Sequence, residues 1–293
     1  MNVEGTERAQ ASRRDIPGAS RAAVFGRFVS PAVASRRSNA GLWRALSIPL
    51  LLFLLLPLAA LLLRTPLDQL LQNLALEQVR EAIALSFGTT LLSAALIVVF
   101  GTPVAYLLAS PRSRLERILD TIVDLPTVLP PSVAGIALLL AFGRRGLLGP
   151  VFDVLGVHVA FTSVAVVLAQ TFVASPFYIK SAALAFASID ADLLQAAALD
   201  GAGNRQIFRH ITVPLAWAGL VSGLVMSWAR ALGEFGATIL FAGNLQGVTQ
   251  TMPLAIYIGF EVNIETAATL SVILLALSFT ALLLAKALLS RAR

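Results

Sequence analysis

Six long apolar segments follow one another along the chain, each close to the length that a helix needs to cross a bilayer. A transmembrane helix takes about 20 mainly apolar residues, because the hydrocarbon core is roughly 30 Å thick. Since lipid offers no partners for backbone N–H and C=O groups, the pattern predicts an all-α integral membrane protein with six transmembrane helices. The predicted spans are 46–63, 83–109, 121–142, 161–186, 213–232 and 267–289.

The third segment differs from the others in its prolines. Pro130 and Pro131 are adjacent, and Pro126 lies one helical turn before them. Each proline removes a backbone donor and clashes with the preceding turn. The carbonyl groups left free need partners from protein or cavity water, which makes Pro130 and Pro131 candidates for a translocation pathway or gate. A kink that serves packing alone is the other interpretation of these prolines.

The composition disfavours a soluble enzyme. Hydrophobic residues make up 57% of the 293 positions and charged residues 13%, whereas a soluble domain averages about 25% charged residues. The chain has no cysteine, and its two histidines, His158 and His210, fall on opposite predicted sides of the membrane. We therefore expect no disulfide, no metal site and no bound cofactor.

Basic residues are distributed unevenly between the two sides of the predicted membrane. On the side that holds both termini lie 16 lysines and arginines, counting Lys286 near the end of the last span, and 4 lie on the other side. Because cytoplasmic segments carry the excess of basic residues, both termini are expected in the cytoplasm of a multi-pass cytoplasmic membrane protein. The net charge of +6 then indicates contact with membrane lipid and not with nucleic acid.

Three regions follow from this pattern. Residues 1–45 are rich in arginine, serine, alanine and glycine, and we expect them to form a disordered basic cytoplasmic tail. Residues 46–82 hold the first transmembrane helix and an external loop, and residues 83–293 hold the other five spans. Candidate functional residues are therefore sought in 83–293.

Motifs of membrane-embedded and nucleotide-hydrolysing enzymes are missing from the sequence. It contains no H-E-x-x-H zinc motif, no G-x-S-x-G nucleophile elbow and no G-x-x-x-x-G-K-[ST] phosphate loop. The chain is therefore not expected to be an enzyme. If it transports a substrate with ATP, a partner subunit must bind the nucleotide.

The longest connection on the cytoplasmic side, 187–212, has helical features but is too polar to enter lipid. Ser188 or Asp190 is suited to cap a first short helix, and Gly201 permits the turn that ends it. A second short helix is expected before Pro214, with Phe208 on its apolar face. Such a helix pair suits a groove on a cytoplasmic partner, and a pair lying flat on lipid is the alternative.

Within this connection, the stretch Gln195-Ala-Ala-Ala-Leu-Asp-Gly201-Ala-Gly, then Ile207-Phe208 and Ile211-Thr-Val-Pro214, resembles the cytoplasmic EAA loop of type I ABC importer permeases. The resemblance implies that fold for 83–293 and a loop that docks in a cleft of an ATP-binding subunit. Gln195 replaces the glutamate of the motif, which removes a charge but keeps the hydrogen-bonding reach. The resemblance gives the coupling role to Gln195, Ala196, Ala197, Asp200, Gly201, Phe208 and Pro214.

Two further stretches narrow the resemblance. Asp124-Leu-Pro-Thr-Val-Leu-Pro-Pro-Ser-Val-Ala-Gly135 and Arg230-Ala-Leu-Gly-Glu-Phe-Gly-Ala-Thr238 are similar to the permeases for molybdate and, less closely, to those for sulfate and tungstate. The family implies a homodimer of this chain, two copies of an ATPase subunit and an extracytoplasmic oxyanion-binding protein. The expected function is ATP-driven import of an oxyanion, molybdate first, by alternating access.

Arg230 and Glu234 are spaced one helical turn apart near the outer end of the fifth span. Charges at this depth are costly unless they pair, so we expect the two side chains to neutralise each other. The pair either fixes the helix end or takes part in a gate. Lys180 is another cation within the spans and is expected to extend toward the cytoplasmic surface. A secondary transporter driven by an ion gradient is the alternative class of function.

Overall fold

The computed structural model describes residues 40–110 and 113–291, so most of the predicted basic tail lies outside the described residues. Over these two ranges the chain forms helices and loops and no strand. The helices are α3 (Ala40–Arg64), α4 (Leu67–Leu74), α5 (Glu77–Leu108), α6 (Arg114–Val128), α7 (Pro131–Phe142), α8 (Gly149–Val154), α9 (Ser163–Ala187), α10 (Ala191–Leu199), α11 (Asn204–Ile207), the π-helix η1 (Phe208–Thr212), α12 (Val213–Leu232), α13 (Gly236–Phe241), α14 (Met252–Val262) and α15 (Ile264–Arg291).

Five of the six predicted spans correspond to single helices that are long and apolar enough to cross a membrane. Among the described residues, the helical segments that meet this condition are Trp43–Arg64, Glu77–Leu108, Ser163–Ala187, Asn204–Leu232 and Ile264–Ala287. They match the predicted first, second, fourth, fifth and sixth spans. The apolar pattern was sufficient here because each run is uninterrupted and exceeds the bilayer length.

The third predicted span, 121–142, consists of two helices, α6 and α7, with the break at the adjacent prolines that the sequence singled out. The chain bends by 117° between α6 and α7, so this pair counts as a sixth span only if both halves are taken together. The break follows from Pro130 and Pro131, which have no N–H group to continue the helix. The first half also starts earlier than predicted, at Arg114, because Ser113 and Glu116 form a capping box there.

The fifth span is longer than predicted, because the short helix expected before Pro214 is continuous with it. The π-helical turn η1 joins α11 to α12 without a break. The Val213 N–H donates to the Phe208 carbonyl, one residue beyond the usual α-helical partner. Pro214 follows at once and has no N–H to donate, so a widened turn at this point keeps the helix intact.

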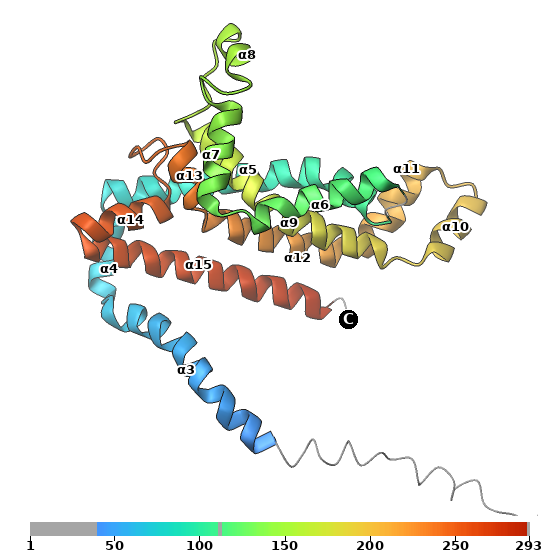
Figure 1. Cartoon of the computed structure of the whole chain (residues 1–293). Coiled ribbons are helices and arrows are strands. Elements are labelled where there is room, and N and C mark those ends of the chain that lie inside the picture. Colours follow the sequence, from blue (N-terminus) through green and yellow to red (C-terminus); the bar gives the residue numbers. More distant parts are fainter. Residues whose placement is uncertain (1–39, 111–112, 292–293) are drawn as a thin grey trace, which may run out of the picture. The chain divides into compact units, whose positions relative to one another are not determined.

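Helices α5, α9, α12 and α15 lie side by side and form the body of unit 61–293 (Figure 1). The contact between α9 and α12 depends on two glycines spaced by four residues. A Cβ atom on Gly219 would lie 2.4 Å from Ala185 Cβ, and one on Gly223 would lie 2.7 Å from Ser181 Cβ. Small residues at this spacing let two membrane helices approach closely.

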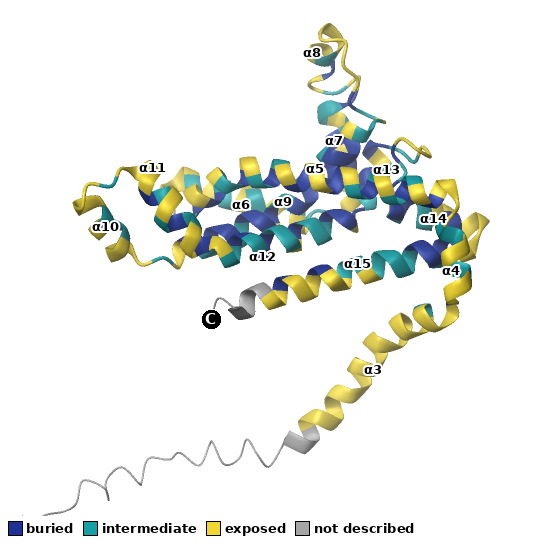
Figure 2. Ribbon diagram, turned by 180° about the vertical axis from the view of Figure 1, so that it is seen from behind, coloured by how far each residue is buried: buried dark blue, intermediate teal, exposed yellow. Residues whose placement is uncertain are grey.

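In contrast, α3 carries almost only exposed side chains along its described length (Figure 2). Apart from the half-buried Leu61, its described leucines are 43% to 84% exposed. Residues 1–60 and 61–293 are separate units. An apolar helix without buried side chains is suited to contact with lipid, because the hydrocarbon core is as apolar as the leucines.

Two helices near the end of the fifth span were not predicted. Helix α13 is six residues long, and α14 has eleven, so neither can cross a membrane alone. Helix α13 packs on α7 and α9, while α14 packs on α15 and α5. Helix α13 therefore lies against the start of α7, where the broken span bends.

Candidate functional site

The predicted coupling loop is built from α10, a tight turn and α11. Asp190 Oδ1 accepts the Asp192 N–H at 2.9 Å and caps α10, which decides between the two predicted caps. At the other end Gly201 has a φ of +88°, where a side chain would be strained. The N–H groups of Gly201 and Ala202 donate to the carbonyls of Ala198 and Ala197, a Schellman turn.

The loop presents α10 to solvent. None of its residues is buried, and Leu199 is 89% exposed. Ala196, Asp200 and Gly201 are exposed as well, and Ala197 is half-buried. Leu199 was not among the predicted coupling residues. The sequence did contain a signal for the exposure of Leu199, because an apolar residue at the end of a short loop helix has no hydrophobic core to pack into.

Phe208 lies in a different environment from the rest of the predicted set. Its ring packs against Tyr106 at 5.2 Å and Phe186 at 6.2 Å between ring centroids. Tyr106 belongs to α5 and Phe186 to α9. This aromatic cluster fastens the loop to two membrane helices, so a displacement of α10 and α11 would be passed to the bundle.

Gln195 lines a groove between the loop and α5. The groove has a volume of about 980 Å³, and Thr102, Pro103 and Tyr106 form its α5 wall. Pro214 lies apart from this groove, exposed in the first turn of α12. The structure therefore brings Gln195 and Phe208 onto one groove, leaves Gly201 at the tip and places Pro214 at the base of the loop.

At the other candidate site, the broken span contacts the segment after α12. Pro130 precedes α7 and Pro131 is its first residue. A Cβ atom on Gly236 would lie 2.5 Å from Pro131 Cβ, and one on Gly135 would lie 2.9 Å from the Ala237 carbonyl oxygen. Glycine at these two positions is what allows α7 and α13 to pack this closely.

Glu234 and Arg230 form the ion pair that the sequence predicted. Arg230 Nη1 donates to Glu234 Oε2 at 2.8 Å, and the Glu234 side chain is 1% exposed against 31% for Arg230. The other oxygen, Glu234 Oε1, accepts the Ala237 N–H at 2.8 Å. One buried carboxylate therefore links the end of α12 to the start of α13, which contacts α7. The structure thus brings Pro131, Arg230 and Glu234 into one region.

Lys180 does not extend freely to a surface as expected. Its Nζ atom lies 2.5 Å from Asp120 Oδ1 and 2.9 Å from Asp124 Oδ2, so it bridges α9 to two carboxylates on α6. The sequence analysis did not identify Asp120 or Asp124 as partners. Their spacing of four residues at the start of the predicted third span was the available signal.

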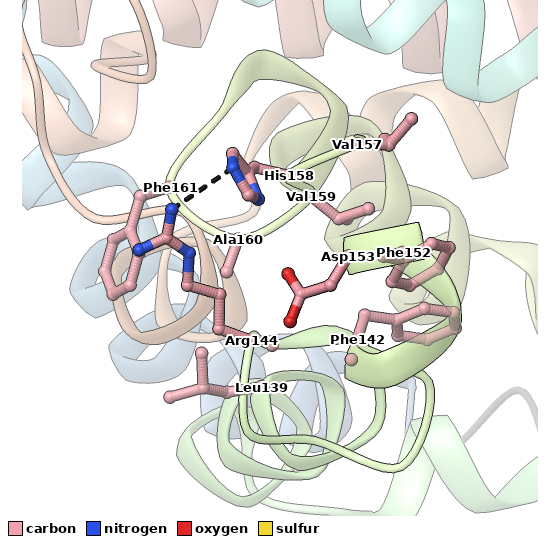
Figure 3. Close-up of a pocket in the computed structure, with 12 residues that line it drawn as sticks. Leu139, Phe142, Arg144, Phe152, Asp153, Val157, His158, Val159, Ala160 and Phe161 are labelled. Carbon is pink, nitrogen blue, oxygen red and sulfur yellow. Dashed lines mark hydrogen bonds between the residues drawn. The ribbon is translucent and has the colours of Figure 1, made fainter. Parts of the chain in front are cut away.

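A cavity of about 360 Å³ opens beside the end of α7 (Figure 3). Arg144 Nη2 lies 3.1 Å from His158 Nε2, and Asp153 also lines the cavity. The backbone N–H of Phe161 donates to the Phe241 carbonyl at 3.2 Å and ties this region to α13. Phe161 has a φ of +61°, an uncommon value for a residue with a side chain.

The long apolar helices, the broken span and the capped loop outside the bundle define a transmembrane transport subunit. Residues 101–293 match the family described as "Binding-protein-dependent transport system inner membrane component". The chain belongs to this family and is a multi-pass inner membrane permease subunit.

Three relatives have 38% to 42% sequence identity to this chain. The molybdenum transport system permease protein ModB of Mycobacterium tuberculosis is 42% identical over 224 residues, which cover 76% of this chain and 85% of the relative. ModB of Escherichia coli is 38% identical over 209 residues, which cover 70% of this chain and 91% of the relative. The probable transport system permease protein NifC of Clostridium pasteurianum is 38% identical over 248 residues, which cover 84% of this chain and 87% of the relative.

Solved structures of ABC importers share the fold. A chain of a bacterial alginate importer aligns with a TM-score of 0.63 at 19% identity, covering 87% of this chain and 98% of the other. A chain of the MetNI methionine transporter aligns with a TM-score of 0.57 at 20% identity, covering 73% of this chain and 96% of the other. These identities establish the fold alone, and they confirm the type I ABC importer permease fold expected from the EAA-like loop.

Proposed function

We propose that this chain is the permease subunit of an ATP-driven importer that carries molybdate across the cytoplasmic membrane by alternating access. The observation that carries the proposal is the 42% identity over 224 residues to a molybdenum transport permease, combined with an exposed loop that suits an ATPase. Sulfate and tungstate are the other oxyanions to test. A secondary transporter driven by an ion gradient would need neither an exposed docking loop nor a partner ATPase.

The proposed assembly contains two copies of this chain, two ATPase subunits and an extracytoplasmic oxyanion-binding protein. The permease contributes no nucleotide site of its own, so ATP hydrolysis is assigned to the ATPase. Both termini are proposed to lie in the cytoplasm, because the segments on their side carry most of the basic residues. The three proposed regions keep the bounds 1–45, 46–82 and 83–293.

In this proposal the loop around Gly201 is the coupling element. Ala196, Ala197, Asp200 and Gly201 would contact the ATPase cleft, whereas Phe208 would transmit the movement to α5 and α9. Gln195 would act from the groove wall by hydrogen bonding and without the charge of the family glutamate. Pro214 would hold the base of the loop at the start of α12.

The proposed gate is the contact between α7 and α13. Pro130 and Pro131 free the chain to bend, and the Arg230–Glu234 pair fixes the segment that packs on Pro131. A movement of α12 would reach α7 through Glu234, because this carboxylate touches both α12 and α13.

The substrate assignment is tested by uptake into vesicles that contain the permease and the ATPase, with the binding protein outside. We expect uptake of molybdate at low concentration to persist in the presence of excess sulfate, because selection by the binding protein precedes translocation. Equal competition by sulfate would reassign the substrate to sulfate. Uptake by the permease alone, without ATP, would support a secondary transporter instead.

The coupling role is tested at Gly201, where the turn has open space around it. Gly201→Trp is expected to abolish transport by blocking the docking surface, while the chain still inserts in the membrane. Gly201→Ala is the matched control, because it adds the same left-handed strain, about 1–2 kcal/mol, without the bulk. Full transport by Gly201→Trp, with ATPase still bound, would contradict the proposed coupling role.

A further inference from the structure

The charge cluster of Lys180, Asp120 and Asp124 lies within α9, a spanning helix, and α6, the first half of the broken span, and not at the ends of either helix. Asp120 lies six residues after the start of α6, and Lys180 lies seven residues before the end of α9. At 1.5 Å per residue both are about 10 Å from the same end of the bundle, the end that carries the α10 loop. Charged groups at such depth are rare and mark substrate or ion pathways.

The cluster has an unbalanced charge and remains partly open. One ammonium faces two carboxylates at 2.5 and 2.9 Å, which leaves a formal charge of −1. The side chains are 32% exposed for Lys180, 44% for Asp120 and 48% for Asp124. Lipid would not solvate the excess negative charge, so water is the suitable neighbour for the open side of the cluster.

Helix α6 separates polar from apolar residues around its circumference. Asp120, Asp124 and the exposed Thr127 are spaced by four and three residues and share one side. Glu116 and the exposed Arg117 lie on the same side and carry opposite charges, so they leave the net charge of −1 unchanged. The opposite side carries an apolar row that is 48% to 64% exposed and consists of Leu115, Ile118, Ile122 and Leu125. The apolar row suits lipid or another apolar surface, and the acidic side does not.

We propose that the acidic side of α6, with Lys180, lines the aqueous pathway between the α6–α7 break and the end of the bundle that carries the α10 loop. This inference rests on the proposed oxyanion import and assigns the cluster to the exit of the pathway. Two carboxylates occupy Lys180 Nζ, so a passing dianion meets a net negative surface and no free ammonium. Repulsion keeps the residence time of the oxyanion short and favours its release.

The position of the pathway is tested by cysteine labelling, because the natural chain has no cysteine. Thr127→Cys places one thiol on the acidic side and leaves the ion pairs intact, and Ile122→Cys is the matched control on the apolar row. We expect a charged methanethiosulfonate reagent to label Thr127→Cys in membranes that hold the whole transporter and to leave Ile122→Cys unlabelled. No labelling of Thr127→Cys, or equal labelling of both, would overturn the inference.

The exit role is tested by transport kinetics in the same vesicles. Asp120→Asn with Asp124→Asn leaves a free ammonium, which should retain the oxyanion and lower kcat and KM together, on the order of tenfold. Lys180→Met leaves two carboxylates and should raise KM by a similar factor. Lys180→Arg keeps the charge and should restore KM to within about twofold of the natural chain.

Opposite changes in KM are the distinguishing result, because a purely structural cluster would lower the amount of transporter or kcat without moving KM in two directions. A KM that is unchanged in both variants, or that moves the same way, would overturn the exit role. The labelling result does not depend on the substrate. It can therefore fail while molybdate import holds, and it can hold if the substrate proves to be sulfate.

Discussion

At the scale of single residues, the described part of the chain places the charged side chain of Glu234 in a buried position. It is a buried carboxylate with both oxygens engaged, one by Arg230 at 2.8 Å and the other by the Ala237 N–H at 2.8 Å. A buried charge is tolerated when it is paired and hydrogen-bonded, and it is costly when either partner is lost. The stability of the protein therefore depends on α13 keeping its hydrogen bond to Glu234.

Glu234→Gln is expected to lower the free energy of unfolding by about 1–3 kcal/mol, because it leaves the Arg230 charge without its partner while keeping an acceptor for Ala237. Since Arg230 is 31% exposed, water offsets part of this loss. Thermal unfolding of the purified protein in detergent measures the effect. Adding Arg230→Met to Glu234→Gln should recover part of the lost stability. A double variant that loses the sum of both single effects would contradict a direct pair.

At the scale of elements, the close contact of α9 and α12 holds the bundle together. Ser181 Oγ donates to the Gly219 carbonyl at 2.9 Å, and Ser227 Oγ donates to the Ala174 carbonyl at 2.8 Å. In lipid these contacts replace the hydrophobic driving force that would join helices in water. Gly219 and Gly223 make the approach possible because they place no side chain between the two backbones.

Gly219→Ala is expected to destabilise the protein by about 1–3 kcal/mol, because the added methyl would overlap Ala185 in a tightly packed contact. Gly88→Ala is the matched control, since no atom lies within 4 Å of a Cβ atom at Gly88. Alanine is also the better helix former, so the control should be neutral or stabilising by up to about 1 kcal/mol. Unfolding midpoints of both variants in detergent give the comparison. Equal midpoints would argue against a specific role for the glycine pair.

At the scale of the whole molecule, the loop that suits a motor subunit and the region that suits a gate lie at opposite ends of the bundle. The α10 loop lies beyond the ends of α9 and α12, whereas α7 and α13 meet at the opposite ends of these helices (Figure 1). Helices α9 and α12 run between the two regions and pack closely against each other. This arrangement is what transport driven by a separate ATPase requires.

The proposed orientation predicts opposite accessibility for two exposed leucines. Leu147 follows α7 and is 87% exposed, and Leu199 ends α10 and is 89% exposed. In a chain without natural cysteines, Leu147→Cys should react with an impermeant thiol reagent added outside intact cells, and Leu199→Cys only after the membrane is opened. The chain is expressed without the ATPase so that Leu199 stays uncovered. The reverse pattern would invert the proposed topology.

The sequence by itself determined the helical class, the five spans that form continuous helices and the short capped helix that ends at Gly201. These features depend on local properties: the length of apolar runs, a capping residue at 188 or 190 and a glycine at the helix end. The Arg230–Glu234 pair was also predictable, because its two members lie one turn apart on the chain.

Only the tertiary structure decided the rest. The prolines of the third span indicated a break. The angle of 117° and the packing of α13 against Pro131, a contact between residues about 100 positions apart, are visible only in the structure. Lys180 pairs with Asp120 and Asp124 across 60 and 56 positions, a distance over which sequence spacing carries no geometric information. The ring of Phe208 likewise packs against the bundle, because Tyr106 and Phe186 contact it there. Local patterns specify helices and turns, whereas long-range packing decides which faces meet.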